Sequence, residues 1–115
     1  MSTEPAVAPL TLFVLIKALP SFLSLSHGER RDIADTVAAG LPEGLAVRQF
    51  DCEAFSAKCS DIWVLENTNP TEANDTLERL RDSPIFAKPY FELVAILPAI
   101  ENSWRRFEAT HNLPA

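Results

Sequence analysis

A continuous apolar segment near the start of the chain, Leu10 to Ala18, constrains the fold more than any other feature. It is rich in Leu, Val, Ile and Phe, carries one charged residue, and is closed by Pro20. A run of this length is too short to span a bilayer as a helix. Its β-branched and aromatic content is typical of a strand buried on both faces. The rest of the chain is therefore expected to pack around one central strand.

Two long helices are predicted by their capping signals. Ser26-x-x-Glu29 is a capping box, in which the serine hydroxyl accepts from backbone N–H groups and the glutamate reaches back. Apolar residues then recur at helical spacing until Gly40. Asn69, followed by a proline, is a good start for the second long helix.

Three further strands are predicted at residues 45–55, 59–66 and 90–97, and a short helix follows residue 98. The order β-α-β-β-α-β is that of a ferredoxin-like α+β sandwich, in which two right-handed crossovers form one antiparallel sheet. We expect a single domain of this type at residues 10–115, behind a flexible tail at residues 1–9. In this arrangement we expect the first and third strands to run parallel.

Both faces of this sheet are expected to be apolar, although two helices can cover only one of them. The side chains expected toward the helices are Leu12, Val14, Ile16, Ile62, Val64, Val94 and Ile96. Those expected on the second face are Phe13, Leu15, Trp63, Leu65, Phe91, Leu93, Ala95 and Leu97. A bare apolar face of that size is not left in water, so we expect a homodimer of the dimeric α+β barrel type. The alternative is a monomer whose C-terminal helix covers the face through Trp104 and Phe107.

Three carboxylates form the first candidate catalytic group: Asp51, Glu53 and Asp61. Strand alternation places them on one face near the hairpin, and like charges held that close raise one pKa, which suits a general acid or base. The competing interpretation is a solvated hairpin tip whose acids are neutralised by nearby bases.

Lys17 is the fourth candidate catalytic residue, because a lysine that ends an apolar strand binds an anion or acts as a base when desolvated. The competing interpretation is a lysine whose stem packs and whose ammonium reaches water. With parallel first and third strands, it is expected at the sheet end opposite the carboxylates. The candidate ligand-binding aromatics are Trp63, Tyr90 and Phe13, and we expect Trp63 to be buried.

Charge and cysteine usage exclude several kinds of partner. The net charge of −6 and the lack of basic clusters argue against nucleic acid and anionic membranes. No Cys-x-x-Cys pair or His-rich motif supports a metal, and no cofactor motif is found, so we expect neither. Without a basic segment before the first apolar run, no signal peptide is predicted, and we expect a cytoplasmic protein.

Several stretches together resemble the darcynin family. They are Leu12–Ser21, Asp51–Phe55, Cys59–Ile62, Leu80–Pro84 and Pro89–Glu92, and the similarity runs over nearly the whole chain. The resemblance implies a bacterial protein of a family without an assigned reaction, and it supplies no catalytic residues.

The hairpin between the second and third strands has two possible registers. A two-residue loop puts Cys52 opposite Cys59, where the pair could form a disulfide. A three-residue loop puts Asp51 opposite Asp61 and Glu53 opposite Cys59. Tight two-residue loops need residues with positive φ, which this segment lacks, so we expect the carboxylate register with both thiols free. The two registers exclude each other on this interpretation.

Two functions are compatible with these observations. The first is a small-molecule-binding protein or enzyme of dimeric α+β barrel type, whose apolar cavity carries a few carboxylates and a lysine. Its ligand would be small and apolar and would sit between sheet and helices. The second is a non-catalytic dimeric interaction or regulatory module. An enclosed polar-lined cavity favours the first, and a fully packed interior favours the second.

Overall fold

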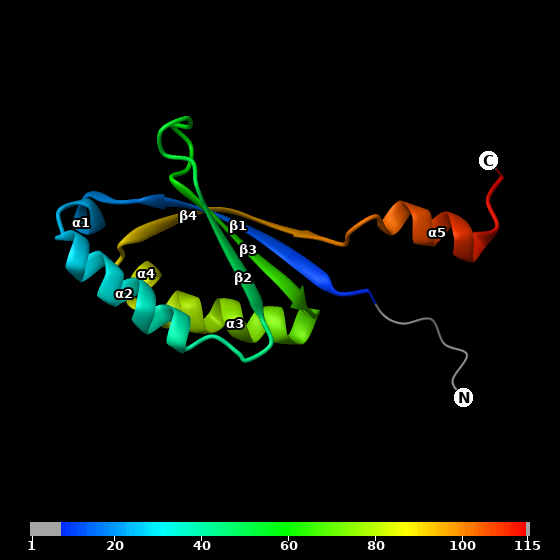
Figure 1. Cartoon of the computed structure of the whole chain (residues 1–115), viewed down its shortest axis with the longest axis horizontal. Coiled ribbons are helices and arrows are strands. Elements are labelled where there is room, and N and C mark those ends of the chain that lie inside the picture. The colour runs from blue at the N-terminus through cyan, green and yellow to red at the C-terminus, as the bar shows by residue number, and fades with distance from the viewer. Residues whose placement is uncertain (1–7, 115) are drawn as a thin grey trace.

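The computed structural model describes residues 8–114 and confirms the ferredoxin-like α+β fold (Figure 1). The strands are β1 (Leu10–Ala18), β2 (Ala46–Asp51), β3 (Asp61–Thr68) and β4 (Phe91–Ala99). They form one antiparallel sheet in the order β2-β3-β1-β4, with the apolar strand β1 in an interior position. The tail expected at residues 1–9 lies almost entirely outside the described residues.

Within residues 8–114, four helices lie on one side of the sheet and a fifth stands apart (Figure 1). They are α1 (Pro20–Leu23), α2 (His27–Ala39), α3 (Pro70–Asp82) and α4 (Pro84–Ala87), with α5 (Ser103–His111) after β4. The capping box is confirmed, because the Glu29 N–H donates to Ser26 Oγ at 3.1 Å and the Ser26 N–H donates to Glu29 Oε1 at 3.2 Å. Asn69 caps α3 by accepting from the Glu72 N–H at 2.9 Å. The short helices α1 and α4 were not predicted; each begins at a proline, whose fixed φ suits a first helical position.

The hydrophobic core lies between the sheet and the helices α3 and α4. Leu12, Val14 and Ile16 of β1 are at most 2% exposed and pack in one cluster with Leu65, Ala73 and Ile85. Helix α2 contributes no fully buried residue, although its apolar side faces the sheet. The core is therefore well filled under α3 and α4 and poorly filled under α2.

The relation between β1 and β3 differs from the sequence prediction. The two strands are antiparallel neighbours, with Val14 opposite Trp63 and Ile16 opposite Asp61. In this topology each crossover connects two parallel strands across a third strand that lies antiparallel between them. Lys17 directly follows Ile16, the last β1 residue that pairs with β3, and therefore lies at the hairpin end of the sheet and not at the opposite end.

The expected division of side chains between the two faces is wrong for β3. Residues that pair directly across strands share a face. Leu65 pairs with Leu12 and Trp63 pairs with Val14, so Leu65 and Trp63 lie on the helix-covered face. Ile62 and Val64, paired with Leu15 and Phe13, lie on the other face. In β4 the expected faces are also wrong, because the pairing register shifts between Leu15 and Ile16 of β1. Leu93 therefore pairs with Ile16 on the helix side, and Val94, which was expected there, is 41% exposed.

The hairpin between β2 and β3 has the expected register but a longer connection. Asp51 pairs with Asp61, as predicted, yet pairing stops there and residues 52–60 form the connection. The Cys52 carbonyl accepts from the Phe55 and Ser56 N–H groups at 3.0 and 2.9 Å, which turns the chain early. Glu53 therefore has no strand partner, contrary to its expected position opposite Cys59.

Helix α5 confirms the predicted C-terminal helix but does not cover the open sheet face. Figure 1 shows it projecting beyond the end of β4, away from the sheet and the other helices. Trp104 and Phe107 are 57% and 49% exposed, and Leu97 of the open face is 52% exposed. The monomeric alternative, in which this helix covers its own sheet, is therefore wrong for this structure.

Candidate functional site

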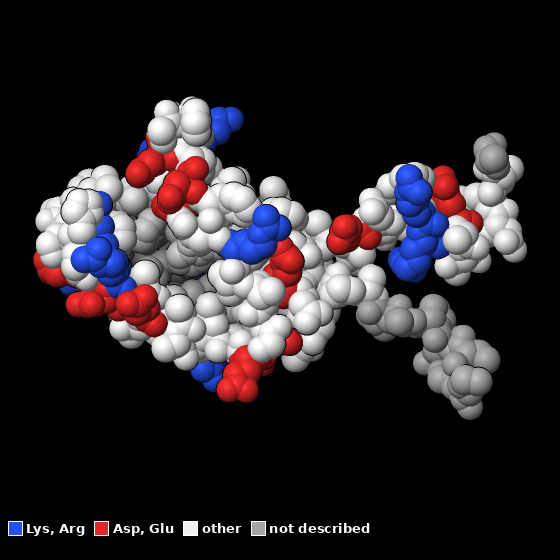
Figure 2. Space-filling view, viewed as in Figure 1, with Lys and Arg blue, Asp and Glu red and all other residues white. Residues whose placement is uncertain are grey.

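A cavity of about 720 Å³ lies between α2 and the sheet. The residues that line it are Ala18, Phe22, Leu23, His27, Arg30, Arg31, Ala34, Val37, Ala38, Leu41, Val47, Gln49, Asp51, Glu53, Asp61, Trp63, Leu65, Leu80, Ile85 and Phe91. Figure 2 shows it as a hollow below the projecting hairpin, with acidic side chains on the hairpin side and basic ones toward α1. Its volume is within the range of about 300–1,000 Å³ that is typical of small-molecule sites.

The cavity exists because α2 presents small side chains to the sheet. Ala34 and Ala38 line it and remain exposed, although they lie on the sheet-facing side of the helix. Every residue of the edge strand β2 is also exposed. A helix packs closely only when side chains interdigitate across the gap, and alanines are too short to fill it. The space beneath α2 is therefore open to a ligand.

Two aspartates and a glutamine form the polar end of the cavity. Asp51 and Asp61 face each other across β2 and β3, and Gln49 lies two residues before Asp51 on the same face of β2. The Gln49 Nε2 group donates to Asp51 Oδ1 and to Asp61 Oδ1, both at 2.8 Å, so one amide holds the two carboxylates together. Ser60 Oγ donates to Asp61 Oδ2 at 2.7 Å. The candidate acid pair is therefore a connected hydrogen-bond network on the cavity wall.

The surroundings of Asp61 favour its protonated form. Burial raises the pKa of Asp61 above the ordinary value for an aspartic acid, and the neighbouring Asp51 and Glu53 carboxylates raise it further. The hydrogen bond from Ser60 stabilises the carboxylate and lowers the pKa of Asp61 in part. A carboxyl group with a raised pKa binds a proton more tightly than a solvated one, which suits a general acid or base.

Asp61→Asn is expected to become more stable relative to the wild-type chain as the pH rises. The raised pKa means that the folded state binds this proton more tightly than the unfolded state does. Stability from the proton is present below the unfolded pKa and is lost as the pH rises through the folded pKa. Asparagine carries no such dependence. Urea unfolding at about pH 4 and about pH 7 measures the difference.

Asp32→Asn is the matched control, because Asp32 is an exposed carboxylate of α2 that does not line the cavity. A stability difference between wild type and Asp61→Asn that is the same at both pH values would contradict the prediction.

The other candidate residues do not join the acid pair. Lys17 is exposed on the opposite face of the sheet, where its Nζ donates to the Ala57 carbonyl at 3.3 Å. Phe13 also lies on that face. Tyr90 is 8% exposed in the core, and its hydroxyl accepts from Lys88 Nζ at 2.9 Å. Trp63 lines the cavity and is half-buried rather than buried.

Sequence reasoning missed the basic side of the cavity, which α2 supplies. Four residues of α2 line the cavity and recur at helical spacing: His27, Arg31, Ala34 and Ala38. Their shared helix face could therefore have been predicted from the sequence. Arg30 also lines it; its Nη2 donates to the Leu23 carbonyl at 2.6 Å and its guanidinium lies 5.5 Å from the ring centre of Phe22.

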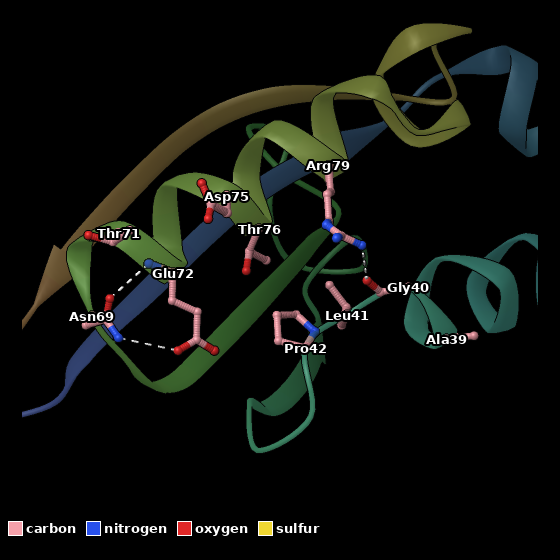
Figure 3. Close-up of a pocket in the computed structure, with 10 residues that line it drawn as sticks. All are labelled: Ala39, Gly40, Leu41, Pro42, Asn69, Thr71, Glu72, Asp75, Thr76 and Arg79. Carbon is pink, nitrogen blue, oxygen red and sulfur yellow. Dashed lines mark hydrogen bonds between the residues drawn. The ribbon is translucent and has the colours of Figure 1, made fainter.

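A second hollow, of about 580 Å³, lies between the end of α2 and the helix α3 (Figure 3). Three of its polar side chains are occupied by local structure, whereas the buried Thr76 hydroxyl has no hydrogen-bond partner among the described residues. Figure 3 shows Asn69 and Glu72 engaged in capping α3, and Arg79 reaching the Gly40 carbonyl at 3.5 Å. This hollow lies where α2 and α3 approach each other, and fewer large apolar side chains line it than line the cavity beneath α2.

None of the helices within residues 8–114 is long and apolar enough to cross a membrane. In the same part of the chain, no group of three or more His, Cys, Asp or Glu side chains is arranged to hold a metal ion.

Comparison with known sequences identifies relatives along the whole chain. A family model described as Darcynin, domain of unknown function, matches residues 1–114. A darcynin of Chromobacterium violaceum is 42% identical over 73 residues, which cover 64% of this chain and 91% of that protein. A darcynin homolog of Streptomyces avermitilis is 34% identical over 110 residues, covering 92% of this chain and 90% of the homolog.

Comparison with solved structures identifies a shared fold. Chlorite dismutase from Candidatus Nitrospira defluvii, in complex with imidazole, matches 80% of this chain with a TM-score of 0.67 and 8% identity. A double mutant of that enzyme matches 96% of this chain with a TM-score of 0.65 and 9% identity. The match spans only 39% and 51% of those longer chains. At this level of identity the similarity shows the fold alone.

Proposed function

The chain belongs to the darcynin family, and we propose that it binds a small, largely apolar molecule in the cavity beneath α2. The observation that carries the proposal is an apolar cavity of about 720 Å³ with a hydrogen-bonded aspartate pair at one end. Walls of Val37, Trp63 and Phe91 exclude water from a ligand's apolar part. A chlorite dismutase with the same fold is known in complex with imidazole, so this architecture accommodates small molecules.

The polar end of the cavity specifies the ligand's polar group. Asp51, Asp61 and Glu53 supply carboxylate oxygens, which accept hydrogen bonds and attract positive charge. Of the two arginines that line the cavity, Arg30 and Arg31, the first already donates to a backbone carbonyl and lies over an aromatic ring. A ligand that carries an amine or another hydrogen-bond donor therefore fits better than one that carries a carboxylate. The same pair can accept a proton from such a group or return it.

Decylamine is expected to bind and decanoic acid is expected not to bind. Each probe is titrated below its micellar concentration, in a Trp104→Phe background that leaves Trp63 as the reporter. Saturable change in Trp63 emission measures binding. Asp61→Asn is expected to weaken the amine by about tenfold or more, because a charge-assisted hydrogen bond is lost.

Two matched variants test the location of the probe. Ala34→Phe narrows the cavity without adding a tryptophan and is expected to abolish decylamine binding, whereas Asp35→Phe changes the next residue, which does not line it. Equal binding of amine and acid would contradict the proposed ligand class. Binding that survives Ala34→Phe would contradict the site.

We further propose that the protein is a homodimer, in which two open sheet faces meet and each α5 packs on the partner. Among residues 8–114, the chain carries both an apolar sheet face that no other element covers and an apolar helix that packs on no other element (Figure 1). The exposed apolar side chains on these two surfaces include Phe13, Val94, Leu97, Ile100, Trp104 and Phe107. A second copy supplies the missing half of each contact at once, as a two-fold axis requires.

The size of the open face explains why α5 is needed. Four strands about 4.8 Å apart and nine residues with a rise of about 3.3 Å give a face of roughly 600 Å². A stable interface buries about 800 Å² on each partner. The sheet face alone falls short, and the apolar side of α5 supplies the remainder. In static light scattering the chain is then expected at twice its mass of 12.7 kDa.

A further inference from the structure

Two cysteines lie side by side where the hairpin leaves the sheet. Cys52 Sγ and Cys59 Sγ are 3.3 Å apart, and Cys52 Sγ also lies 3.4 Å from the Cys59 carbonyl oxygen. Cys59 is 8% exposed and Cys52 is half-buried. Both are free thiols in this structure. An S–S bond is about 2.05 Å long, so the two sulfurs need to approach by little more than 1 Å.

Backbone hydrogen bonds hold the two cysteines in place. The Cys52 N–H donates to the Ser60 carbonyl at 2.9 Å, which continues the ladder one step beyond Asp51 and Asp61. The Ser60 N–H donates to the Ile16 carbonyl at 2.8 Å and fixes this corner to β1. The thiols therefore meet because the strand frame brings them together, and bond formation leaves the carboxylate register intact.

We propose that Cys52 and Cys59 are a redox-active dithiol that forms a reversible intramolecular disulfide by exchange with a low-molecular-weight disulfide such as oxidised glutathione. One thiol loses its proton and attacks the reagent, giving a mixed disulfide and one molecule of reduced reagent. The second thiol then attacks the protein sulfur, forms the Cys52–Cys59 bond and releases the other reduced molecule. In total, the two S–H bonds of the protein and the S–S bond of the reagent are replaced by one S–S bond in the protein and two S–H bonds in the reduced reagent.

The surroundings set the speed of this reaction. The hydrogen bond with Cys59, burial, and the charges of Asp61 and Asp51 raise the pKa of Cys52 to about 11. Because the thiolate is the attacking form, little of Cys52 reacts at neutral pH, and oxidation accelerates as the pH rises. The pair is thus suited to slow equilibration with a thiol pool and not to rapid peroxide sensing.

Oxidation closes the hairpin tip next to the acid pair. Cys52 stands between Asp51 and Glu53, and Cys59 is two residues before Asp61. The disulfide therefore ties the two strands together directly beyond the cavity's polar end. This proposal does not depend on the ligand proposed for the cavity, because the chemistry concerns the thiols alone.

The test incubates reduced protein with oxidised glutathione and counts thiols and adducts by mass spectrometry. The wild-type chain is expected to lose both thiols, gain no glutathione and yield a Cys52–Cys59 cross-linked peptide. Cys52→Ser and Cys59→Ser are each expected to retain one glutathione, because the resolving thiol is gone. The rate for the wild-type chain is expected to rise throughout the range from about pH 7 to about pH 10.

Three outcomes would overturn the proposal. The first is wild-type protein that carries two glutathiones, which means that the sulfurs cannot meet. The second is wild-type protein that stays reduced under conditions that modify both serine variants. The third is a cross-link only between chains, which light scattering in denaturant distinguishes from an internal bond. Far-UV circular dichroism of the serine variants establishes that each is folded before its thiol is counted.

Discussion

Leu12→Ala is expected to lower the free energy of unfolding by about 3 to 4 kcal/mol. Leu12 is 2% exposed on the interior strand β1, and it lies opposite Leu65 within the core cluster. Truncation removes the transfer free energy of its methyl groups and leaves a void, since neighbouring strands are fixed by ladder hydrogen bonds. Urea unfolding at one protein concentration measures the change, because stability depends on concentration if the protein is a dimer.

Phe55→Ala provides the control for this prediction. Phe55 is larger than leucine but 94% exposed at the hairpin tip, so its truncation is expected to change stability by less than about 0.5 kcal/mol. A loss at Leu12 no greater than the loss at Phe55 would mean that the core does not lie beneath β1.

Local signals in the sequence predicted the elements well because each depends on a few adjacent residues. The capping box at Ser26 and Glu29 and the Asn69 cap act within one helical turn, and the structure contains both. The apolar run of β1 required an interior strand, and it is one. Such features are determined by chemistry that is independent of the rest of the fold.

The division of side chains between the two faces failed for a physical reason. Leu12 to Ile16 is apolar at every position, so alternation along β1 contains no contrast between the faces. Residues 62–65 have the same property. Only the antiparallel pairing of Leu12 with Leu65 determines which side meets the helices, and pairing is a long-range property.

The sequence predicted the acid pair of the candidate site but not the thiol contact or the cavity. The pairing of Asp51 with Asp61 was predicted correctly, although the three-residue loop from which it was derived is replaced by a connection of residues 52–60 that keeps the same register. The partnership of the two thiols was missed, because the connection turns at Cys52 and brings its sulfur to Cys59 without shifting the ladder. The two arrangements that excluded each other in an ideal hairpin therefore coexist. The cavity itself depends on how far α2 stands from the sheet, which no local signal encodes.

The open sheet face is apolar across three strands. β1, β3 and β4 contribute to it through Phe13, Ile62 and Leu97. The hairpin also rises from the sheet beside it (Figure 1). Burial of this face in the proposed dimer would therefore stabilise the scaffold that positions the acid pair and the thiols.

Leu97→Arg is expected to convert the proposed homodimer into a monomer. Leu97 lies opposite Phe13 on the open face and is 52% exposed, so in a dimer it is desolvated against the partner. An arginine there would bury a charge without a counter-ion, which costs several kcal/mol on each side of the two-fold axis. Static light scattering at a fixed micromolar concentration is then expected to give half the wild-type mass.

Leu23→Arg is the matched control, because Leu23 is 49% exposed but belongs to α1 on the helix side of the sheet. It introduces the same residue at nearly the same exposure, and it is expected to leave the dimer intact. A wild-type chain that is already monomeric would refute the homodimer, and a Leu97→Arg chain that stays dimeric would move the interface off the sheet. Dissociation by Leu97→Arg alone is expected, because only that substitution places a charge where two apolar faces and two α5 helices must close around each other.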